Sequence, residues 1–111
     1  MAEGYQDVFG YKIGDTTTFY VRSLGRVVSA GNALYTYLVT DKPILSTSTN
    51  ISITLTSFNA IELNSTQAVT ADTTNISVLS VARNMILFTI PTNSLTPNKA
   101  YYIEASATVH F

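Results

Sequence analysis

The sequence predicts an all-β protein, an antiparallel β-sandwich of seven to nine short strands. The clearest observation is the strict alternation of apolar and polar side chains from Tyr101 to Phe111, the pattern of a strand with one buried and one exposed face. Turn-forming residues recur roughly every 8–12 residues, the spacing of a small sandwich. The 111 residues include only 12% charged ones but 17 Thr, 11 Ser and 8 Asn, and Thr favours half-buried pleated surfaces. A compact jelly roll or small barrel is the alternative packing.

The length fits a single domain, which we divide into an N-terminal arm, residues 1–15, and one β-sandwich, residues 16–111. The arm carries Tyr5, Phe9 and Tyr11, and the glycines between them argue against a helix. It forms either an extended arm or a short first strand. Because aromatic rings exposed to water favour association, we expect them to fold back on the domain or to dock on a neighbouring subunit.

The first long strand is expected at Thr16–Ala30, with a bulge or bend where Gly25 interrupts the alternation. Gly31 and Asn32 predict a two-residue hairpin, because glycine supplies the positive φ that such a turn requires. The returning strand, Ala33–Thr40, has one face of Leu34, Thr36, Leu38 and Thr40 and another of Tyr35, Tyr37 and Val39. Both faces are largely apolar or aromatic, so this strand is expected to be central or covered by a partner.

The second half of the chain predicts four more strand regions between the loop that begins at Asp41 and the last strand. Ile51–Leu63 changes the parity of its apolar side chains and therefore needs a one-residue bulge near Ser57–Asn59, or a break into two strands. A short strand is expected at Ala68–Thr70. Ile76–Ala82 and Met85–Ile90 form a hairpin around Arg83 and Asn84, and the second of these strands, which is apolar on both faces, ends at Pro91.

The segment that leads into the last strand has a recognisable spacing of residues: Leu95, Pro97, Tyr101, Ile103 and Ala105. This spacing resembles that of bacterial and phage immunoglobulin-like and fibronectin type III-like domains of virion and surface proteins, and the resemblance covers about Ile51–Phe111. It implies an Ig-like fold in which the hydroxyl of Tyr101 bonds back to the backbone a few residues upstream. Such domains carry one further strand, which the N-terminal segment or a neighbouring chain would supply here. The family implies adhesion, spacing or decoration and brings no catalytic residue.

Nothing in the sequence indicates catalysis, a cofactor or a metal site. The chain has no cysteine, one histidine, His110, and seven widely spread acids, of which only Asp72, close to Asn75, suggests contact with an ion. Asn50, Asn64 and Asn75 fit the N-glycosylation pattern, which occurs by chance in so Asn- and Ser-rich a chain. The six cations are scattered, which disfavours nucleic acid, and no apolar run is long enough to span a membrane. The first residues do not form a secretory signal.

The aromatic residues point instead to contacts with other molecules, since Tyr is favoured where an apolar surface meets a polar one. The candidate subunit-interface residues are Tyr5, Phe9, Tyr11, Tyr35 and Tyr37. We expect a non-enzymatic structural protein of a bacteriophage particle, such as a capsid decoration, head-fibre or tail-associated subunit, with other virion subunits or its own copies as partners. The alternative is a carbohydrate-binding or adhesion module at a cell surface.

Overall fold

The computed structural model describes residues 9–27, 31–45, 50–62, 69–95 and 100–111, and these form an all-β structure. The six strands are β1 (Thr16–Val27), β2 (Ala33–Val39), β3 (Ser52–Glu62), β4 (Ser77–Val81), β5 (Met85–Pro91) and β6 (Ala100–His110). They form one antiparallel sheet in the order β3-β6-β1-β2-β5-β4. The fold class expected from the sequence is therefore confirmed at the level of an antiparallel all-β protein.

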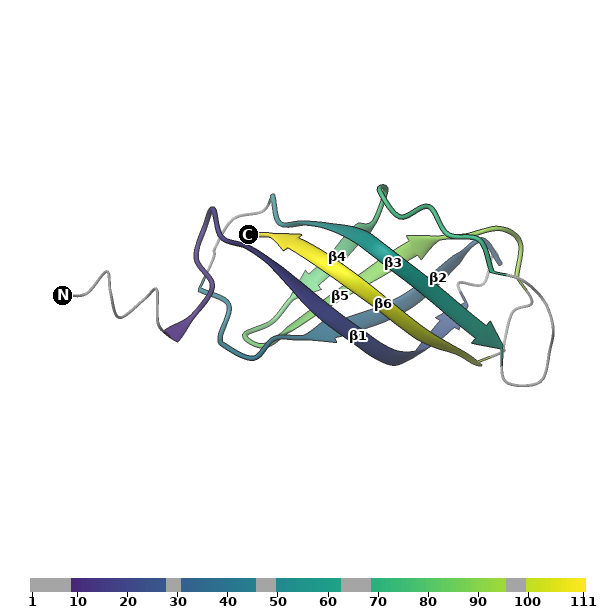
Figure 1. Cartoon of the computed structure of the whole chain (residues 1–111), viewed down its shortest axis with the longest axis horizontal. Coiled ribbons are helices and arrows are strands. Elements are labelled where there is room, and N and C mark those ends of the chain that lie inside the picture. Colours follow the sequence, from purple (N-terminus) through teal and green to yellow (C-terminus); the bar gives the residue numbers. More distant parts are fainter. Residues whose placement is uncertain (1–8, 28–30, 46–49, 63–68, 96–99) are drawn as a thin grey trace.

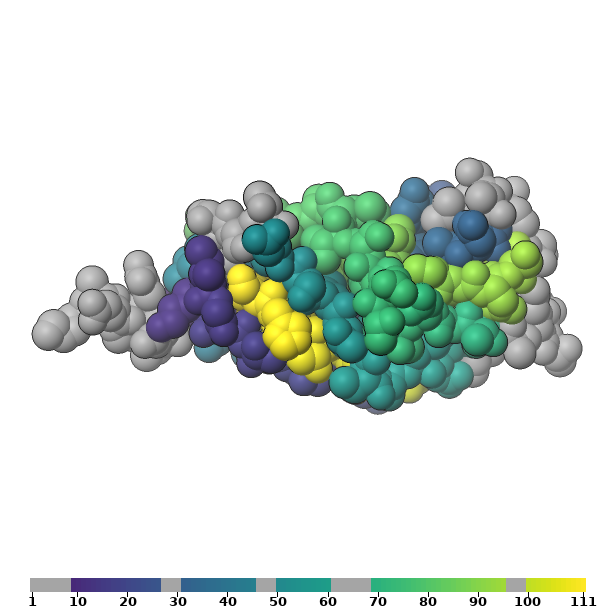
Figure 2. Space-filling model, turned by 90° about the horizontal axis from the view of Figure 1, so that it is seen from above, coloured from purple at the N-terminus to yellow at the C-terminus, as the bar shows by residue number. Residues whose placement is uncertain are grey.

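The last strand, β6, lies in the interior of the sheet, between β1 and β3. It pairs with β1 from Thr16–His110 to Arg26–Ala100, and with β3 over nearly the same length. Figure 2 shows β6 in yellow between β1 in purple and β3 in teal. Both edges of β6 are thus occupied by strands of the same chain, and no strand from the arm or from another chain is needed beside it.

The sheet is strongly curled, because its two halves, β3-β6-β1 and β2-β5-β4, are joined by a very short ladder. Between β1 and β2 the register covers only Arg26–Tyr35 and Val27–Leu34. Beyond these pairs the strands diverge, and Figure 1 shows β3, β6 and β1 crossing at an angle over β2, β5 and β4. The inner faces of both halves supply one core, whose fully buried large side chains are Leu34, Ile86, Phe88, Ile90, Tyr101, Ile103 and Val109.

The strand parities follow the sequence patterns. In β6 the odd-numbered side chains from Tyr101 to Val109 are buried, as the alternation predicts. In β2 the even-numbered side chains are buried and Tyr35, Tyr37 and Val39 face outward. β4 and β5 form the expected hairpin, and β5 ends at Pro91.

The described residues contain six strands rather than seven to nine, because two short segments form only isolated bridges. Tyr11 makes a parallel bridge with Ile44, and Ala71 makes an antiparallel bridge with Thr92. Residues 69 and 70, the described part of the short strand expected at Ala68–Thr70, are not in a strand. Each of these segments meets its neighbour at a single point, so neither extends into a ladder.

Gly25 does not mark a bulge, contrary to expectation. Its pairing with Tyr101 continues an unbroken register along β1, and a Cβ placed on Gly25 would lie 2.3 Å from Cδ1 of Ile103. Close packing against Ile103, rather than a bend, therefore favours glycine at this position. The bulge expected in β3 is present one position earlier, at Thr56, where the register with β6 shifts between Leu55 and Ser57.

Gly31 has the positive φ, 78°, that the hairpin prediction required. The register does not fit the predicted two-residue turn, because an unbroken ladder onto a turn at Gly31 and Asn32 would pair Leu34 with residue 29, whereas Leu34 pairs with Val27. Residues 28–30, the rest of the connection, lie outside the described part of the chain. Gly31 also packs against Leu95: its carbonyl accepts a 2.5 Å hydrogen bond from the Leu95 N–H, and an added Cβ would lie 2.7 Å from the Leu95 oxygen. Tyr101 is fully buried, while the upstream backbone to which a tyrosine corner would bond is not described.

Three further contacts hold the two halves together. Midway along the divergence, the buried hydroxyls of Ser23 on β1 and Thr36 on β2 are 2.6 Å apart. Near one end, the backbone N–H of Leu55 in β3 donates to the carbonyl of Thr73, just before β4, at 3.0 Å. At the N-terminal end, Tyr11 packs on the β1–β6 side and bonds to Asp41 after β2. The curl is therefore fixed by a few polar contacts around a shared apolar core.

Candidate functional site

The outer faces of the two halves differ in chemistry. On the β3-β6-β1 half, hydroxyl and charged side chains line the outer surface and bond to one another. Thr18 lies 3.0 Å from Thr108 through their hydroxyls, and the Tyr20 hydroxyl donates to Glu104 at 3.3 Å. This is the solvated outer face that an antiparallel sheet normally presents.

The outer face of the β2-β5-β4 half is instead apolar. Five large side chains project from it, each between 38% and 62% exposed: Tyr35, Tyr37, Val39, Leu79 and Leu87. We call this set the apolar face. Pairing between β2 and β5 sets Tyr37 opposite Leu87 and Val39 opposite Met85, so these side chains form adjacent rows. Such a contiguous patch differs from the singly scattered apolar residues of an ordinary surface.

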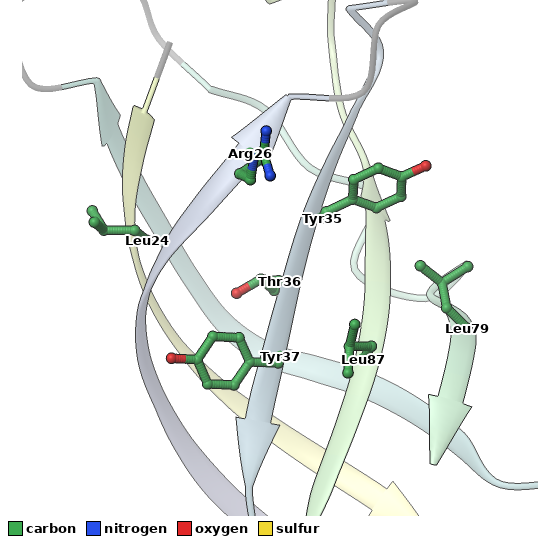
Figure 3. Close-up of a pocket in the computed structure, with 7 residues that line it drawn as sticks. All are labelled: Leu24, Arg26, Tyr35, Thr36, Tyr37, Leu79 and Leu87. Atoms are coloured by element: carbon green, nitrogen blue, oxygen red, sulfur yellow. The ribbon is translucent and has the colours of Figure 1, made fainter. Parts of the chain in front are cut away.

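An open groove of about 360 Å³ runs across this face where β1 and β2 diverge. The described residues that line it are Leu24, Arg26, Tyr35, Thr36, Tyr37, Leu79 and Leu87. In Figure 3 the ring of Tyr37 extends from β2 toward β1, and the ring of Tyr35 extends toward β5. Leu24 forms the β1 side of the groove and Leu79 the β4 side. The groove is thus assembled from four strands.

Leu79 reaches the groove because β4 is bulged there. The register between β4 and β5 shifts between Val78 and Ser80, which leaves Leu79 as the extra residue of the bulge. A bulge re-aims a side chain and bends the strand, so it directs Leu79 outward and interrupts regular pairing along this edge strand. The same irregularity therefore completes the apolar face and makes the edge a poor template for strand addition.

The groove carries very little charge. Arg26 is the single charged side chain among the described residues that line it, and none of them is acidic. Arg22, two outward positions earlier on β1, lies with its guanidinium carbon 4.9 Å from the centre of the Tyr20 ring. A cation at this distance over an aromatic face is attracted by the ring quadrupole. The surface therefore suits a partner that is mainly apolar or aromatic.

The structure separates the four described residues among the five that the sequence proposed for an interface. Tyr35 and Tyr37 are together in the groove, and both are half-exposed. Phe9 is exposed at the start of the described chain, and Tyr5 lies outside the described residues. Tyr11 is only 6% exposed because it packs in the core, so it belongs to the fold rather than to the outer surface.

Tyr11 sits in a cluster of aromatic rings. Its ring is stacked on Phe111, with centroids 4.8 Å apart, and meets Phe19 edge-on at 5.4 Å. Its hydroxyl donates a short hydrogen bond to Asp41, and burial, followed by this carboxylate, raises the pKa of Tyr11 to about 12. The same bond lowers the pKa of Asp41. Within residues 9–15, Tyr11 thus folds back on the domain, whereas Phe9 is exposed.

The other residues singled out in the sequence do not assemble into a reactive site. His110 lies at the exposed end of β6, with Nδ1 3.1 Å from the Thr16 hydroxyl. The Asp72 carboxylate accepts hydrogen bonds from Thr74 and Asn75, the nearest from the Asn75 amide at 2.7 Å, and these bonds lower its pKa. Its oxygens therefore cap a local turn. Asn50 is exposed, and Asn64 lies outside the described residues.

Sequence reasoning missed Leu24, Arg26, Leu79 and Leu87 as members of the candidate site. Leu87 was recognised only as part of a strand that is apolar on both faces. Leu24 and Arg26 were attributed to a bend at Gly25, whereas the unbroken strand places both on its outward face. Leu79 looked like an ordinary member of its strand, because the bulge that turns it outward depends on pairing with β5.

Among the described residues, no group of three or more His, Asp or Glu side chains is arranged to hold a metal ion. The same residues include no helix with the length and apolar character needed to cross a membrane. No protein-family model matches the chain, and neither a curated protein nor a solved structure matches it.

Proposed function

We propose that this chain is a non-enzymatic structural protein that acts by assembling with other protein subunits through the apolar face. The observation that carries the proposal is the concentration of large apolar side chains on the outer surface of β2, β5 and β4. The core of the molecule is complete without them, since the inward side chains of the same strands are already buried. Exposed apolar patches of this kind mark interaction sites.

We place the protein in a bacteriophage particle, as a capsid decoration, head-fibre or tail-associated subunit. The support comes from the sequence: low charge, absence of cysteine, and the resemblance of Leu95, Tyr101 and Ile103 to Ig-like domains of virion and surface proteins. All three of these side chains are buried. We retain the Ig-like sandwich as part of this proposal.

Incorporation into particles tests this function directly. Particles purified from the source on a density gradient are expected to contain the chain, detected by mass spectrometry. Leu87→Glu puts a carboxylate on the apolar face and is expected to reduce incorporation at least tenfold. Thr18→Glu, the matched control, adds the same charge to the exposed outer surface of β1 and should incorporate normally. Complete particles that lack the chain, or equal incorporation of both variants, would contradict the proposal.

A second function is favoured by one specific observation. Tyr35 and Tyr37 lie in an open groove beside Arg26, and tyrosine rings with a polar neighbour form surfaces on which sugar rings stack. A carbohydrate-binding or adhesion module at a cell surface would use this groove. A glycan array should then give ligands whose binding is lost in Tyr37→Ala, with circular dichroism confirming the fold. An array without ligands for correctly folded protein would reject this alternative.

A further inference from the structure

We propose that the apolar face binds a second copy of this chain, in a closed twofold dimer in which the two β2-β5-β4 halves pack face to face. The inference rests on the proposed function and names the partner of the same surface. Packing one sheet face on another is the usual way for a sheet to bury an apolar outer surface. Four features of the face favour a second copy as the occupant.

The first feature is the size of the surface. An aromatic side chain presents roughly 150–250 Å² and an aliphatic one somewhat less, so the exposed fractions of the apolar face and Leu24 amount to about 600 Å². Two copies would together remove about 1,200 Å² of apolar surface from water, before any flanking polar residue is counted, and a specific interface needs about 1,000 Å² or more. The face is therefore large enough for a dimer without a contribution from the rest of the molecule.

The second feature is charge. A face-to-face dimer brings identical charges near one another, which disfavours self-association of most surfaces. Here Arg26 is the one charged side chain among the described lining residues, so little charge would be desolvated on either side. A nucleic acid or a strongly acidic protein would need a cluster of cations that this groove does not provide.

The third feature is self-complementarity. The groove holds both members of a cation–aromatic pair, the guanidinium of Arg26 and the rings of Tyr35 and Tyr37. A twofold axis repeats every contact, so an arginine of one copy that meets a ring of the other is matched by the reciprocal contact. The same pairing already occurs within this chain, where Arg22 lies over the ring of Tyr20 at 4.9 Å.

The fourth feature is the bulged edge. Edge-to-edge addition through β4 would build an open series of copies, because each molecule would still have a further edge to offer. The bulge at Leu79 interrupts the regular ladder of β4 and turns Leu79 into the groove. Face-to-face packing uses Leu79 as part of the contact and closes after two copies.

Sedimentation velocity and light scattering from micromolar to millimolar concentration test the dimer. The unmodified chain should change from monomer to dimer over this range, with no larger species. Leu87→Glu should weaken dimerisation at least tenfold, whereas Thr18→Glu should leave it unchanged. If Leu87→Glu does not fold, Leu79→Ser serves instead, because Leu79 is 53% exposed at an edge strand.

Spin labels report which surface is used. The chain has no cysteine, so a single cysteine at Leu79→Cys or Thr108→Cys carries the only label. A dimer through the apolar face should give a shorter distance between the two labels for Leu79→Cys than for Thr108→Cys.

Several results would overturn this inference. They are a monomer throughout the concentration range, species larger than a dimer, equal sensitivity to both glutamate substitutions, or the reverse order of label distances. A monomer whose incorporation into particles still depends on Leu87 would reject the second copy while leaving the proposed function intact. A dimer that particles do not incorporate would support the second copy as partner and reject the proposed function.

Discussion

The two halves of the sheet have similar inner faces and dissimilar outer faces. Inside, Ile103 and Val109 of one half and Ile86 and Phe88 of the other are fully buried in a common core. Outside, one half carries hydroxyls that bond in pairs, as Thr18 does with Thr108, and the other carries the apolar face. Burial in the core explains the inner faces of both halves, and contact with water explains the polar outer face, but neither explains the apolar face. The contrast therefore separates residues that stabilise the chain from residues that are available to a partner.

The largest expected effects concern the inner faces, where the two halves should behave alike. Phe88→Ala should lower the free energy of unfolding by about 3–5 kcal/mol and Ile103→Ala by about 2–5 kcal/mol, because both side chains are 0% exposed and their loss leaves a cavity. Urea denaturation followed by tyrosine fluorescence measures both. If either substitution were tolerated, that half would not share the core.

The next effect concerns the cluster that joins the halves at Tyr11, and it depends on pH. Because folding raises the pKa of Tyr11 from 10.0 to about 12, its neutral form stabilises the fold fully below pH 10. This contribution should decrease between about pH 10 and 12, by about 2–3 kcal/mol in all, at about 1.4 kcal/mol for each pKa unit. Denaturation across this range measures the loss, and Tyr11→Phe should remove the part of the pH dependence that comes from Tyr11.

Asp41 contributes to the same cluster with the opposite sign. Its pKa is lowered chiefly by the hydrogen bond from Tyr11, so its contribution is present above the pKa of an unfolded aspartate and is lost as the pH falls. Asp41→Asn should reduce the loss of stability in acid, and in Tyr11→Phe this substitution should have a smaller effect. Independent effects of the two substitutions would show that the Tyr11–Asp41 bond does not couple them.

A smaller effect is expected at the polar contact between β1 and β2. Ser23→Ala leaves the buried Thr36 hydroxyl without its partner at 2.6 Å and should cost about 1–2 kcal/mol. The double variant Ser23→Ala, Thr36→Val removes both polar groups and should recover most of this loss. A thermal denaturation cycle of the two single variants and the double variant measures the coupling. Strictly additive losses would mean that the hydroxyls do not stabilise the junction.

The smallest expected effect on stability is at the apolar face itself. Leu87→Ser should change the free energy of unfolding of the monomer by no more than about 0.5 kcal/mol, the usual range for surface substitutions. Thr18→Ser on the polar half should fall in the same range. Denaturation at low micromolar concentration keeps association from contributing. A large loss for Leu87→Ser would assign the apolar face to the fold and would remove the contrast between the halves.

Local patterns predicted the elements and the direction of their side chains. The alternation predicted the buried face of β6, and the change of parity predicted the bulge in β3. Tyr35, Tyr37 and Val39 indicated that the second face of β2 is also apolar. Each of these depends on the period of two along one strand. They were predictable because no information about a neighbouring strand is required.

The order of the strands and the composition of the groove were not predictable in this way. β6 was expected to need a partner from the arm or another chain, whereas it pairs with β1 and β3 along its length. Gly25 suggested a bend in the sequence. The feature that favours glycine there is close contact with Ile103, which belongs to a strand far away in the sequence. Leu79 and Leu24 meet in one groove only once β4, β5, β2 and β1 are aligned, which the sequence of any one strand does not specify.

The interior position of β6 also has a consequence for how the chain folds. Thr16 and His110, which are 94 residues apart in sequence, lie at the start of the long ladder between β1 and β6. β1 and β3 both pair with β6, so neither has this neighbour until β6, the last strand in the sequence, docks between them. Closing so large a loop is entropically costly, and non-local pairing of this kind gives folding times of about milliseconds to seconds. During this interval β4 and β5 can already form their hairpin, and β2 can pair with β5. We therefore expect the β2-β5-β4 half to gain structure first.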